Sequence, residues 1–578
     1  MIKLSRQYRE ETSQKISWGH WFAFFNIIWA IAIGSRYAFL IDWPDTLLGK
    51  IYFFISILGH FSFAVFACYL LIVFPLSFII KNHRTFRGVS VILATIGQTL
   101  LLVDTEVFAR FNLHLSSVVW NLLVNPENGE LSRNWQIFFA PMPIVLLAQM
   151  LFSRWSWDKL RSLSRQRWRK WVAPFFIGCF IATHLIYSWA DAFIYRPITM
   201  QKSNFPLSYP MTARTFLEKH GFLDKTEYDE TIQKEGRLDA PKVDYPLNAL
   251  KFGQNPLRPN ILFITISGLR YDAISPQKMP HLAKFAESSA QFMNHYSTGN
   301  SNNAGLLGLF YGLNGNYTDS VLNNHTPSVL LQTLDQEKYH QAFFSASSFK
   351  DSLFGQSLFY RQTKHLIAKQ TNQAAVQAFI HWQQKQEKNQ PHFAYISLNI
   401  RPNLSTETYN TDLAELDRLF AQILPQLDLD NSLIMISAEQ GYTFQNQDEN
   451  TQRNYFAREE IQVPMIIHWR DFPMGKYEKL SSHADLLPTL LPLYQVKNPA
   501  SDYAQGENLF NPQRQSNWVM AANYRWYAII TPDGTQYHID NKGNYQKYNR
   551  NYEQENSQRP PLGLFLEVFN QNQRFLHK

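Results

Sequence analysis

The sequence predicts a chain of two fold classes: a multi-pass α-helical membrane domain, then an α/β domain with a mostly parallel sheet. Only 17% of the 578 residues are charged, against about 25% in ordinary soluble proteins. The first 190 residues hold 18 Lys and Arg but only 9 Asp and Glu, so the excess positive charge lies there. After Asp191 the composition becomes that of a water-soluble domain. We therefore expect a membrane domain over 1–190, a linker over 191–259 and an outer domain over 260–578.

Five apolar runs in the first part contain no Asp, Glu, Lys or Arg, and each predicts a membrane span. A helix needs about 20 residues to cross about 30 Å of hydrocarbon. We expect spans at about residues 16–35, 51–80, 88–108, 134–153 and 171–190. The third charge-free run, 88–103, is short, and the span expected there continues past Asp104 and Glu106. Without this span the most basic loop would fall on the wrong side of the membrane.

The loop charges predict the orientation of these spans. With five spans, 14 of the 18 basic residues lie on one side of the membrane and four on the other. Short cytoplasmic loops carry the excess of Lys and Arg, so we expect a cytoplasmic N-terminus and an external C-terminal domain. The basic loop from Arg154 to Lys170 is either a topology signal alone or a contact for anionic lipid or a cytoplasmic partner.

Polar side chains are sparse in the predicted spans. His60 and His184 lie within apolar runs, and packing against a neighbouring helix is favoured over a proton relay. A carrier for cardiolipin or another anionic lipid would need a continuous polar path. The nearly charge-free spans predict none, so this function ranks last.

The linker predicts one helix close to the membrane, over Ser203 to Gly221. Prolines precede it, Ser208 is the expected cap, Lys219 lies in the last turn and Gly221 is the expected stop.

From Asn260 onward, short β-rich runs alternate with helical stretches. The expected strands are 260–266, 341–346, 392–398, 432–437 and 463–468, and the expected helices are 280–290, 327–336, 373–386 and 412–427. Nearly continuous apolar strands in such an alternation predict a parallel sheet with helices on both faces. The polar stretch 541–559 is expected to be an exposed hairpin or loop.

Chemistry in doubly wound sheets gathers at the carboxyl ends of the strands. Three segments stand at such places: NILFITISGLRYDA, HYSTGNSNNAGLLGLFYGL and SLIMISAEQGYTF. With EEIQVPMIIHW and SSHADLLPTLLPL, which follow, this region resembles the alkaline phosphatase and sulfatase superfamily, in particular its lipoteichoic-acid-synthase and phosphoethanolamine-transferase branch. The resemblance implies a divalent metal, held by acidic and imidazole ligands, that activates a Ser or Thr nucleophile.

This sequence departs from the superfamily pattern at most ligand positions. Ser267 stands where the first acidic ligand is expected, and Glu439 and Gln440 replace an Asp-His pair. Ser301 falls at or beside the nucleophile position, but one carboxylate would leave it a protonated, weakly nucleophilic alcohol. We expect a pseudo-hydrolase with no cofactor; Mg²⁺ or Zn²⁺ belongs only to the alternative of an active phosphatase, sulfatase or phosphoethanolamine-type transferase.

Each of the other polar candidates also has a structural interpretation. Ser301 is favoured as the cap of a helix from Ala304 onward, and Asp272 as a helix cap over a displaced acidic ligand. His483 and Asp485 could form a metal pair, but their spacing at a helix start favours capping and packing.

Over the whole chain, four segments resemble the YejM (PbgA) family of Gram-negative inner-membrane proteins: SWGHWFAFFNIIWAIAIGSRY, LGHFSFAVFACYLLIVFPL, YRPITMQKSNFPLSYPMTARTFLEKHG and ASDYAQGENLFNPQRQ. The resemblance implies a periplasmic outer domain and a protein that senses lipopolysaccharide. It also implies control of lipopolysaccharide synthesis through the LapB adaptor, which governs FtsH proteolysis of LpxC.

The resemblance places the lipid A site in the segment from Leu207 to Phe216. The expected lipid-binding residues are Phe205, Ser208, Tyr209, Pro210, Met211, Thr212, Ala213, Arg214 and Phe216. Arg214 at a helix N-terminus suits a phosphate, whereas Thr215 stands where family members can carry a second Arg. The alternative is that the segment only docks the outer domain onto the spans.

These observations lead to a non-catalytic lipid A sensor as the predicted function. The expected partners are lipopolysaccharide, anionic phospholipids and a LapB-like adaptor, with no nucleic acid. The metal-dependent enzyme and the anionic-lipid carrier remain the alternatives.

Overall fold

The computed structural model describes most of the chain in two compact units. The described residues are 2–111, 114–115, 119–120, 139–160, 162, 169–347, 349, 353–359, 365–387, 390–402, 404–444, 456–540, 545–555 and 562–577. The first unit comprises residues 1–228, 561–573 and 577–578, and the second comprises 229–560 and 574–576.

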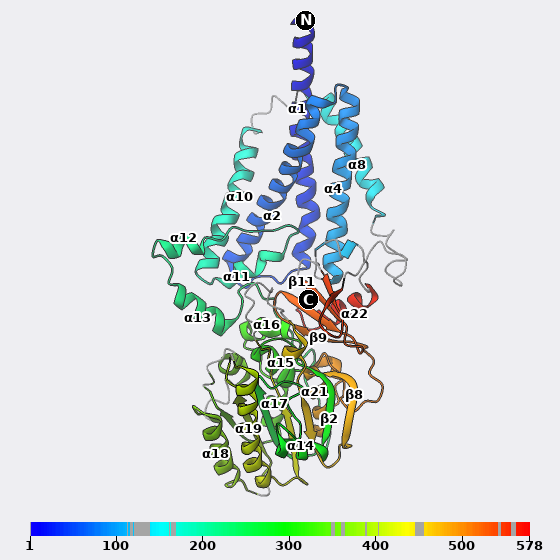
Figure 1. Cartoon of the computed structure of the whole chain (residues 1–578). Helices are drawn as coiled ribbons and strands as arrows, with labels where there is room; N and C mark the ends of the chain where they lie inside the picture. Colours follow the sequence, from blue (N-terminus) through cyan, green and yellow to red (C-terminus); the bar gives the residue numbers. More distant parts are fainter. Residues whose placement is uncertain are drawn as a thin grey trace. The chain divides into compact units, whose positions relative to one another are not determined.

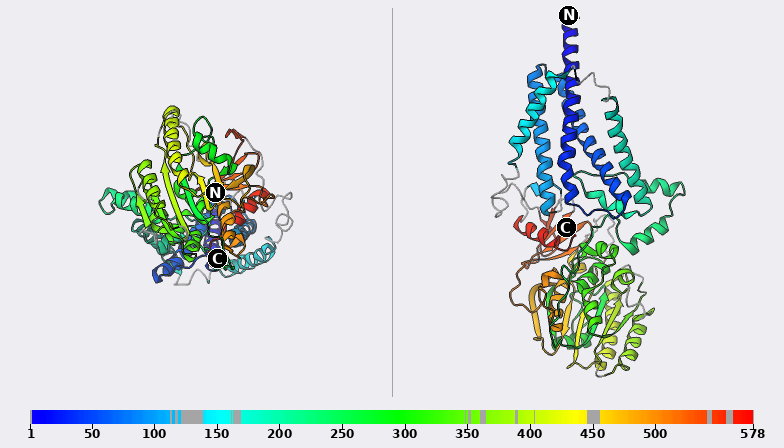
Figure 2. Two further views of the ribbon diagram at one scale, coloured as in Figure 1. Left: turned by 90° about the horizontal axis from the view of Figure 1, so that it is seen from below. Right: turned by 180° about the vertical axis from the view of Figure 1, so that it is seen from behind.

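The first unit is helical. Its elements are α1 (Ile2–Gly34), η1 (Ser35–Phe39), α2 (Leu47–Cys68), the π-helical turn η2 (Tyr69–Val73), α3 (Phe74–Ile79), α4 (His83–Phe111), α8 (Met142–Asp158), α10 (Arg169–Ala192), α11 (Arg196–Thr199), η3 (Met200–Ser203), α12 (Arg214–Lys219) and α22 (Leu562–Asn572), with α13 (Lys225–Glu235) at the boundary. Helix α1 packs against α2, α4 and α8, and α10 packs against α2. Figures 1 and 2 show these long helices side by side.

Four helical stretches are long and apolar enough to cross a membrane. They are Tyr8–Phe39, Leu47–Ile79, His83–Arg110 and Lys170–Ala192, which confirms the predicted helical membrane domain. Helix α8 has 17 residues, about 26 Å of helix, and continues beyond the predicted end at residue 153. Residues 134–138, and residues 161 and 163–168 of the basic loop, lie outside the described residues, so the fourth expected span, at 134–153, stays a prediction.

Three amide side chains meet inside this bundle. Gln149 of α8 donates from Nε2 to Asn26 Oδ1 of α1 at 2.7 Å, and Gln98 of α4 donates to the Asn26 carbonyl at 3.0 Å. All three side chains are buried. Because buried amides need partners, this cluster specifies how the three helices pack.

The predicted helix over Ser203 to Gly221 is wrong in its first half. Residues 205–216, which we call the interfacial segment, are irregular until α12 begins at Arg214, and Ala213 rather than Ser208 is the N-cap. Leu207 has a φ of +56°, and Pro210 disfavours helical backbone at the residue before it. Gly221, at a φ of +73°, ends the helix as predicted, and Phe222 N donates to Leu217 O as in a Schellman cap.

The second unit is built on an eight-stranded sheet in the order β4-β3-β5-β1-β6-β7-β2-β8. Its strands are β1 (Asn260–Ser267), β2 (Ala290–Tyr296), β3 (His340–Ser345), β4 (Leu366–Ala368), β5 (His392–Asn399), β6 (Ser432–Ser437), β7 (Met465–His468) and β8 (Gly475–Ser482). Every paired neighbour is parallel except at β7, which runs antiparallel to β6 and β2. The predicted, mostly parallel sheet is confirmed.

Helices cover both faces of this sheet, as predicted. They are α14 (Pro280–Glu287), α15 (Asn302–Tyr311), α16 (Thr318–Asn323), α17 (Val329–Gln336), α18 (Asn372–Gln383), α19 (Thr406–Ile423), α20 (Arg458–Ile461) and α21 (Leu486–Leu490). Within β1, Ile261 and Phe263 pack with α15, α17 and α21, whereas Leu262 and Ile264 pack with α14, α18 and α19. Helix α14 is shorter than predicted, because β2 begins at Ala290.

A five-stranded antiparallel sheet follows, and the sequence predicted little of it. Its strands are β9 (Val519–Ala522), β10 (Trp526–Ile530), β11 (Gln536–Asp540), β12 (Tyr545–Tyr548) and β13 (Gln554–Glu555). The described part of 541–559 is the antiparallel pair β12 and β13, which confirms the expected hairpin.

Candidate functional site

Side chains of the long helices hold the backbone of the interfacial segment. The Nε2 atom of His60, on α2, lies 2.9 Å from the Pro206 carbonyl oxygen. On α10, His184 Nδ1 accepts from Met211 N at 3.0 Å, and Ser188 Oγ donates to Met211 O at 2.9 Å. The predicted packing role of the two histidines therefore takes a specific form: both bind the backbone of this segment.

Phe205 anchors the start of the segment. Its side chain is buried and stacks on the His60 ring, with 5.7 Å between ring centroids. It also contacts Phe53 and Phe61 of α2. Its burial suits an anchor better than the predicted lipid contact.

Several apolar side chains of the segment are exposed. The exposed fractions are 83% for Leu207, 72% for Tyr209, 48% for Met211 and 59% for Phe216. Thr212 is exposed as well, whereas Ser208, Pro210 and Ala213 are half-buried. Exposed apolar side chains gathered on one short segment are typical of a membrane or lipid contact.

Arg214 is the first residue of α12, and its guanidinium is partly exposed. Its Nε atom forms an ion pair with Asp191 Oδ2 at 2.8 Å, and its side chain is 47% exposed. The guanidinium also lies 5.4 Å from the centre of the Tyr228 ring. The sequence did not predict these two contacts, which hold the guanidinium against Asp191 and Tyr228.

The second candidate site lies at the carboxyl ends of β1 and β6, and it brings together the four residues predicted there. Ser267 Oγ donates to Asn302, the neighbour of Ser301, at 2.9 Å. Gly268 N donates to the Gln440 carbonyl at 3.0 Å, so Gln440 contributes backbone there. Glu439 is the second residue after β6 and is buried.

Hydroxyl groups surround the Glu439 carboxylate. Its Oε1 atom accepts from Thr265 Oγ1 at 2.7 Å, from Tyr395 OH at 3.4 Å and from Ser397 Oγ at 3.5 Å. Burial and the Glu439 charge raise the pKa of Tyr395 well above its usual range, so Tyr395 remains a proton donor. The side chains that surround Glu439 are thus hydrogen-bond donors.

Ser301 occupies a structural position. It is the N-cap of α15, and its side chain accepts from Ala304 N at 3.3 Å, which confirms the predicted cap. Asp272 caps no helix, contrary to the expectation; its carboxylate accepts two hydrogen bonds from Arg270, at 2.8 and 3.1 Å. Burial raises the pKa of Asp272, but its bonds to Arg270 outweigh that effect and lower it overall.

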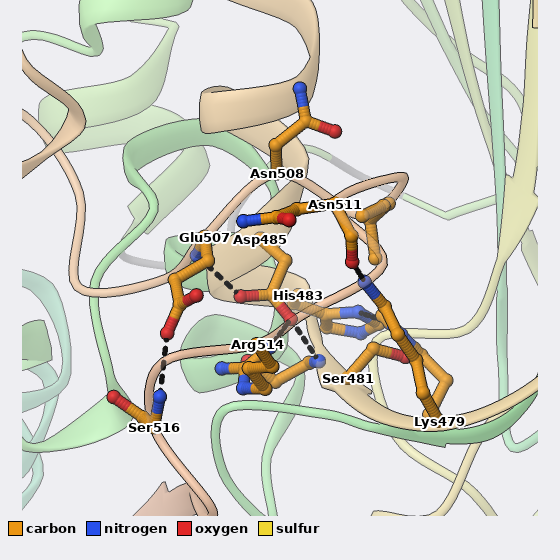
Figure 3. A network of polar contacts seen from close by, with 12 residues as sticks. Lys479, Ser481, His483, Asp485, Glu507, Asn508, Asn511, Arg514 and Ser516 are labelled. Atoms are coloured by element: carbon orange, nitrogen blue, oxygen red, sulfur yellow. Dashed lines mark hydrogen bonds and ion pairs between the residues drawn. The ribbon is translucent and has the colours of Figure 1, made fainter.

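His483 and Asp485 belong to a buried network that fixes the loop after α21 (Figure 3). Asp485 completes a capping box with Ser482, which confirms the predicted capping role. It also accepts from Arg514 Nη1 at 2.6 Å and from Glu507 N at 2.7 Å.

The His483 ring links two strands of the main sheet. Its Nε2 atom lies 2.8 Å from the Ala438 carbonyl, and its Nδ1 atom lies 2.9 Å from Nε2 of the buried His295. Both ring nitrogens are therefore engaged within the protein.

These residues do not fit the divalent metal that the superfamily implies. Glu439 is held by hydroxyl donors, and Ser267 and Gln440 are neutral. Within the described ranges, no three His, Cys, Asp or Glu side chains come together as metal ligands. The donor set suits a carboxylate stabilised by hydrogen bonds rather than a cation.

A helical membrane domain followed by a sheet of this topology defines a membrane-anchored protein of the sulfatase class. Residues 259–496 match the model of the sulfatase family, and residues 5–252 match that of a domain of unknown function, DUF3413. A solved alkaline phosphatase superfamily protein from Vibrio parahaemolyticus aligns with a TM-score of 0.44 and 14% identity, over 62% of this chain and 98% of that one.

Relatives over the full length identify the family. An uncharacterized protein of Haemophilus influenzae is 60% identical over 99% of this chain and 98% of its own length. The inner membrane protein YejM of Salmonella typhimurium is 43% identical over the whole of both chains. The chain belongs to the YejM family of inner membrane proteins.

Proposed function

We propose that the protein is a non-catalytic sensor of lipid A that restrains or releases lipopolysaccharide synthesis. The observation that carries this proposal is the half-exposed guanidinium of Arg214 on the same short segment as several exposed apolar side chains. Lipid A presents phosphate groups next to acyl chains, and this pairing of one cation with apolar surface matches both. Arg also binds phosphate in a bidentate manner that Lys cannot reproduce.

The hydrolase domain acts as a scaffold in this proposal. Ser301 caps a helix, and Glu439 is held by hydroxyl groups rather than poised to ligate a metal. A serine without a base or a metal stays protonated near pH 7 and attacks a phosphate poorly.

The hydrogen bonds that anchor the interfacial segment suggest how the binding of lipid A is signalled to the cytoplasm. His60 and His184 connect its backbone to α2 and α10, two helices long enough to span the membrane. A lipid that shifts the segment would bias the packing of these helices and so reach a cytoplasmic LapB-like adaptor, which then governs FtsH and LpxC. The basic stretch 154–170 is the proposed contact.

The test is lipid A binding by the full-length protein in nanodiscs. The Arg214→Ala variant should bind at least about tenfold more weakly, because a hydrogen-bonded ion contact to phosphate is lost. Arg470→Ala, which removes a similarly exposed arginine of the second unit, should bind like the wild type. Unchanged affinity in Arg214→Ala, or equal competition by phosphatidylglycerol, would contradict the proposed site.

A further inference from the structure

A small pocket lies between α2, α10 and the interfacial segment. It encloses about 380 Å³ of space, part of which is open to solvent, and it is bounded by α2, α10 and residues 201–210. Its lining contains no Lys, Arg, Asp or Glu, and its polar members include Tyr52, His60, His184 and Gln201. A phosphate alone would find no positive charge there, so the pocket requires a different ligand from the one proposed at Arg214.

Gln201 leaves one hydrogen-bond acceptor unused in this pocket. Its side chain is only 4% exposed, and its Nε2 atom donates to Gly49 O at 2.9 Å and to Pro197 O at 2.8 Å. The Oε1 atom is buried and has no partner among the residues that the structure describes. A buried acceptor without a partner is unfavourable, so its position points to a missing donor.

His60 and His184 each add a ring nitrogen whose role as hydrogen-bond donor or acceptor can be assigned. A carbonyl only accepts, so the bond to Pro206 O places the hydrogen of a neutral His60 on Nε2 and leaves a lone pair on Nδ1. His184 Nδ1 accepts from Met211 N, so its hydrogen lies on Nε2. Neither Nδ1 of His60 nor Nε2 of His184 has a hydrogen bond in the described part of the chain.

Tyr52 is the fourth polar residue of the pocket with an unused hydrogen-bonding group. Its side chain is 3% exposed, and its hydroxyl has no hydrogen-bond partner among the described residues. Four polar atoms of residues that line the pocket thus have no hydrogen bond among the described residues: the acceptors Gln201 Oε1 and His60 Nδ1, and the donors His184 Nε2 and the Tyr52 hydroxyl.

We propose that this pocket binds a phosphoethanolamine headgroup. The ammonium group donates to Gln201 and His60, and the phosphate accepts from His184 and Tyr52. A zwitterion carries its own counter-charge, so it suits a polar pocket without charged side chains. The proposal goes beyond lipid A sensing, because it concerns a second ligand and does not involve Arg214.

Occupancy would stabilise the interfacial segment. The segment residues from Ser208 to Pro210 form part of the pocket wall, so a bound headgroup would hold them against α2 and α10. The position of the segment would then depend on both a phosphoethanolamine lipid and lipid A.

The test compares headgroups on the full chain in phosphatidylcholine nanodiscs. We expect labelled phosphatidylethanolamine to be retained beside the protein in preference to phosphatidylcholine, whose methylated nitrogen has no hydrogen to donate, and to phosphatidylglycerol. Tyr52→Phe removes a hydroxyl that has no partner in the described protein, so it should weaken retention about tenfold without affecting folding. Gln201→Met should weaken retention as well.

Two control variants make the result specific. Tyr69→Phe deletes another buried, unpartnered hydroxyl of the same helical stretch, outside the pocket, and should change nothing. Arg214→Ala should lose lipid A but keep phosphatidylethanolamine, so the two proposals fail separately. Equal retention of the three lipids, or wild-type retention by Tyr52→Phe, would overturn the proposal.

Two competitors identify the source of the headgroup. Soluble glycerophosphoethanolamine should displace the label, because it carries the headgroup without acyl chains. If lipid A bearing phosphoethanolamine displaces the label better than phosphatidylethanolamine does, the source is the glycolipid; the reverse result assigns a phospholipid. Displacement by none of them would contradict the pocket assignment.

Discussion

Glu439 is a buried carboxylate that hydroxyl groups surround. Three hydroxyl donors, from Thr265, Tyr395 and Ser397, converge on its Oε1 atom. The carboxylate thus links the carboxyl-terminal halves of β1 and β5 to the residues that follow β6. A buried charge can persist in this way when hydrogen bonds compensate it.

The buried pair His295 and His483 makes the stability of the second unit depend on pH. Burial lowers the pKa of His483 to about 4 and that of His295 well below its usual range, with charge from His483 and Arg514 adding to the second effect. Unfolded histidine binds a proton near pH 6.5, so below that pH the unfolded chain holds more protons. We expect the unfolding free energy to fall with falling pH by about 1.4 kcal/mol per unit for each histidine.

Denaturation of the full-length protein between pH 7 and pH 5, followed by tryptophan fluorescence, measures this slope. A variant with His295→Asn and His483→Gln does not titrate at these positions, so its slope should be shallower. The same slope in both proteins would show that the pair does not carry the effect.

Local signals made some residues predictable and others not. The capping roles of Ser301 and Asp485 follow from side chains within three residues of a helix start, so the sequence predicted both. The donors to Glu439 come from strands far apart in the chain, and only strand pairing brings them together. The contact of Arg214 with Asp191 is likewise a matter of tertiary packing, which no short motif encodes.

Among elements, the strands of the main sheet were the most predictable and the interfacial segment the least. Continuous apolar runs bounded by polar turns predicted β1, β3, β5, β6 and β7. The segment has good helix signals at its end, but its prolines and the left-handed Leu207 break the first half. The second sheet was missed because its short strands, apart from β9 and β10, are only partly buried and carry polar residues.

The amide cluster predicts how the membrane helices depend on one another. Asn26→Leu removes the side-chain partner of Gln149 and one of the two acceptors of Gln98, which keeps the backbone carbonyl of residue 26. The substitution should lower the unfolding free energy by about 1 kcal/mol. Thermal unfolding in detergent measures the change. Replacing all three, with Asn26→Leu, Gln98→Met and Gln149→Met, should recover part of the loss, because no buried amide remains unpaired. A triple variant less stable than the single one would contradict this explanation.

At the scale of the whole molecule, the charge asymmetry predicts the orientation in the membrane. We expect a fluorescent protein at the N-terminus to mature in the cytoplasm and an alkaline phosphatase fused to the C-terminus to be active in the periplasm. Inactive alkaline phosphatase with an intact fusion would reverse the predicted topology.

Composition alone distinguished the two fold classes, because span length and charge exclusion are set by the bilayer. It could not show that α22, near the C-terminus, belongs to the first unit, where Leu566 packs against Val103 and Val107 of α4. Hydrophobic periodicity and motif spacing do not reveal that a C-terminal helix packs against helices from the start of the chain.

The most direct test of a sensor without catalysis is the lipopolysaccharide content of cells that depend on variants of this protein. Ser301→Asp removes the hydroxyl but keeps a good helix cap, and Arg214→Ala removes the proposed phosphate contact. We predict wild-type lipopolysaccharide levels with Ser301→Asp and altered levels with Arg214→Ala. Altered levels with Ser301→Asp and normal levels with Arg214→Ala would contradict the account.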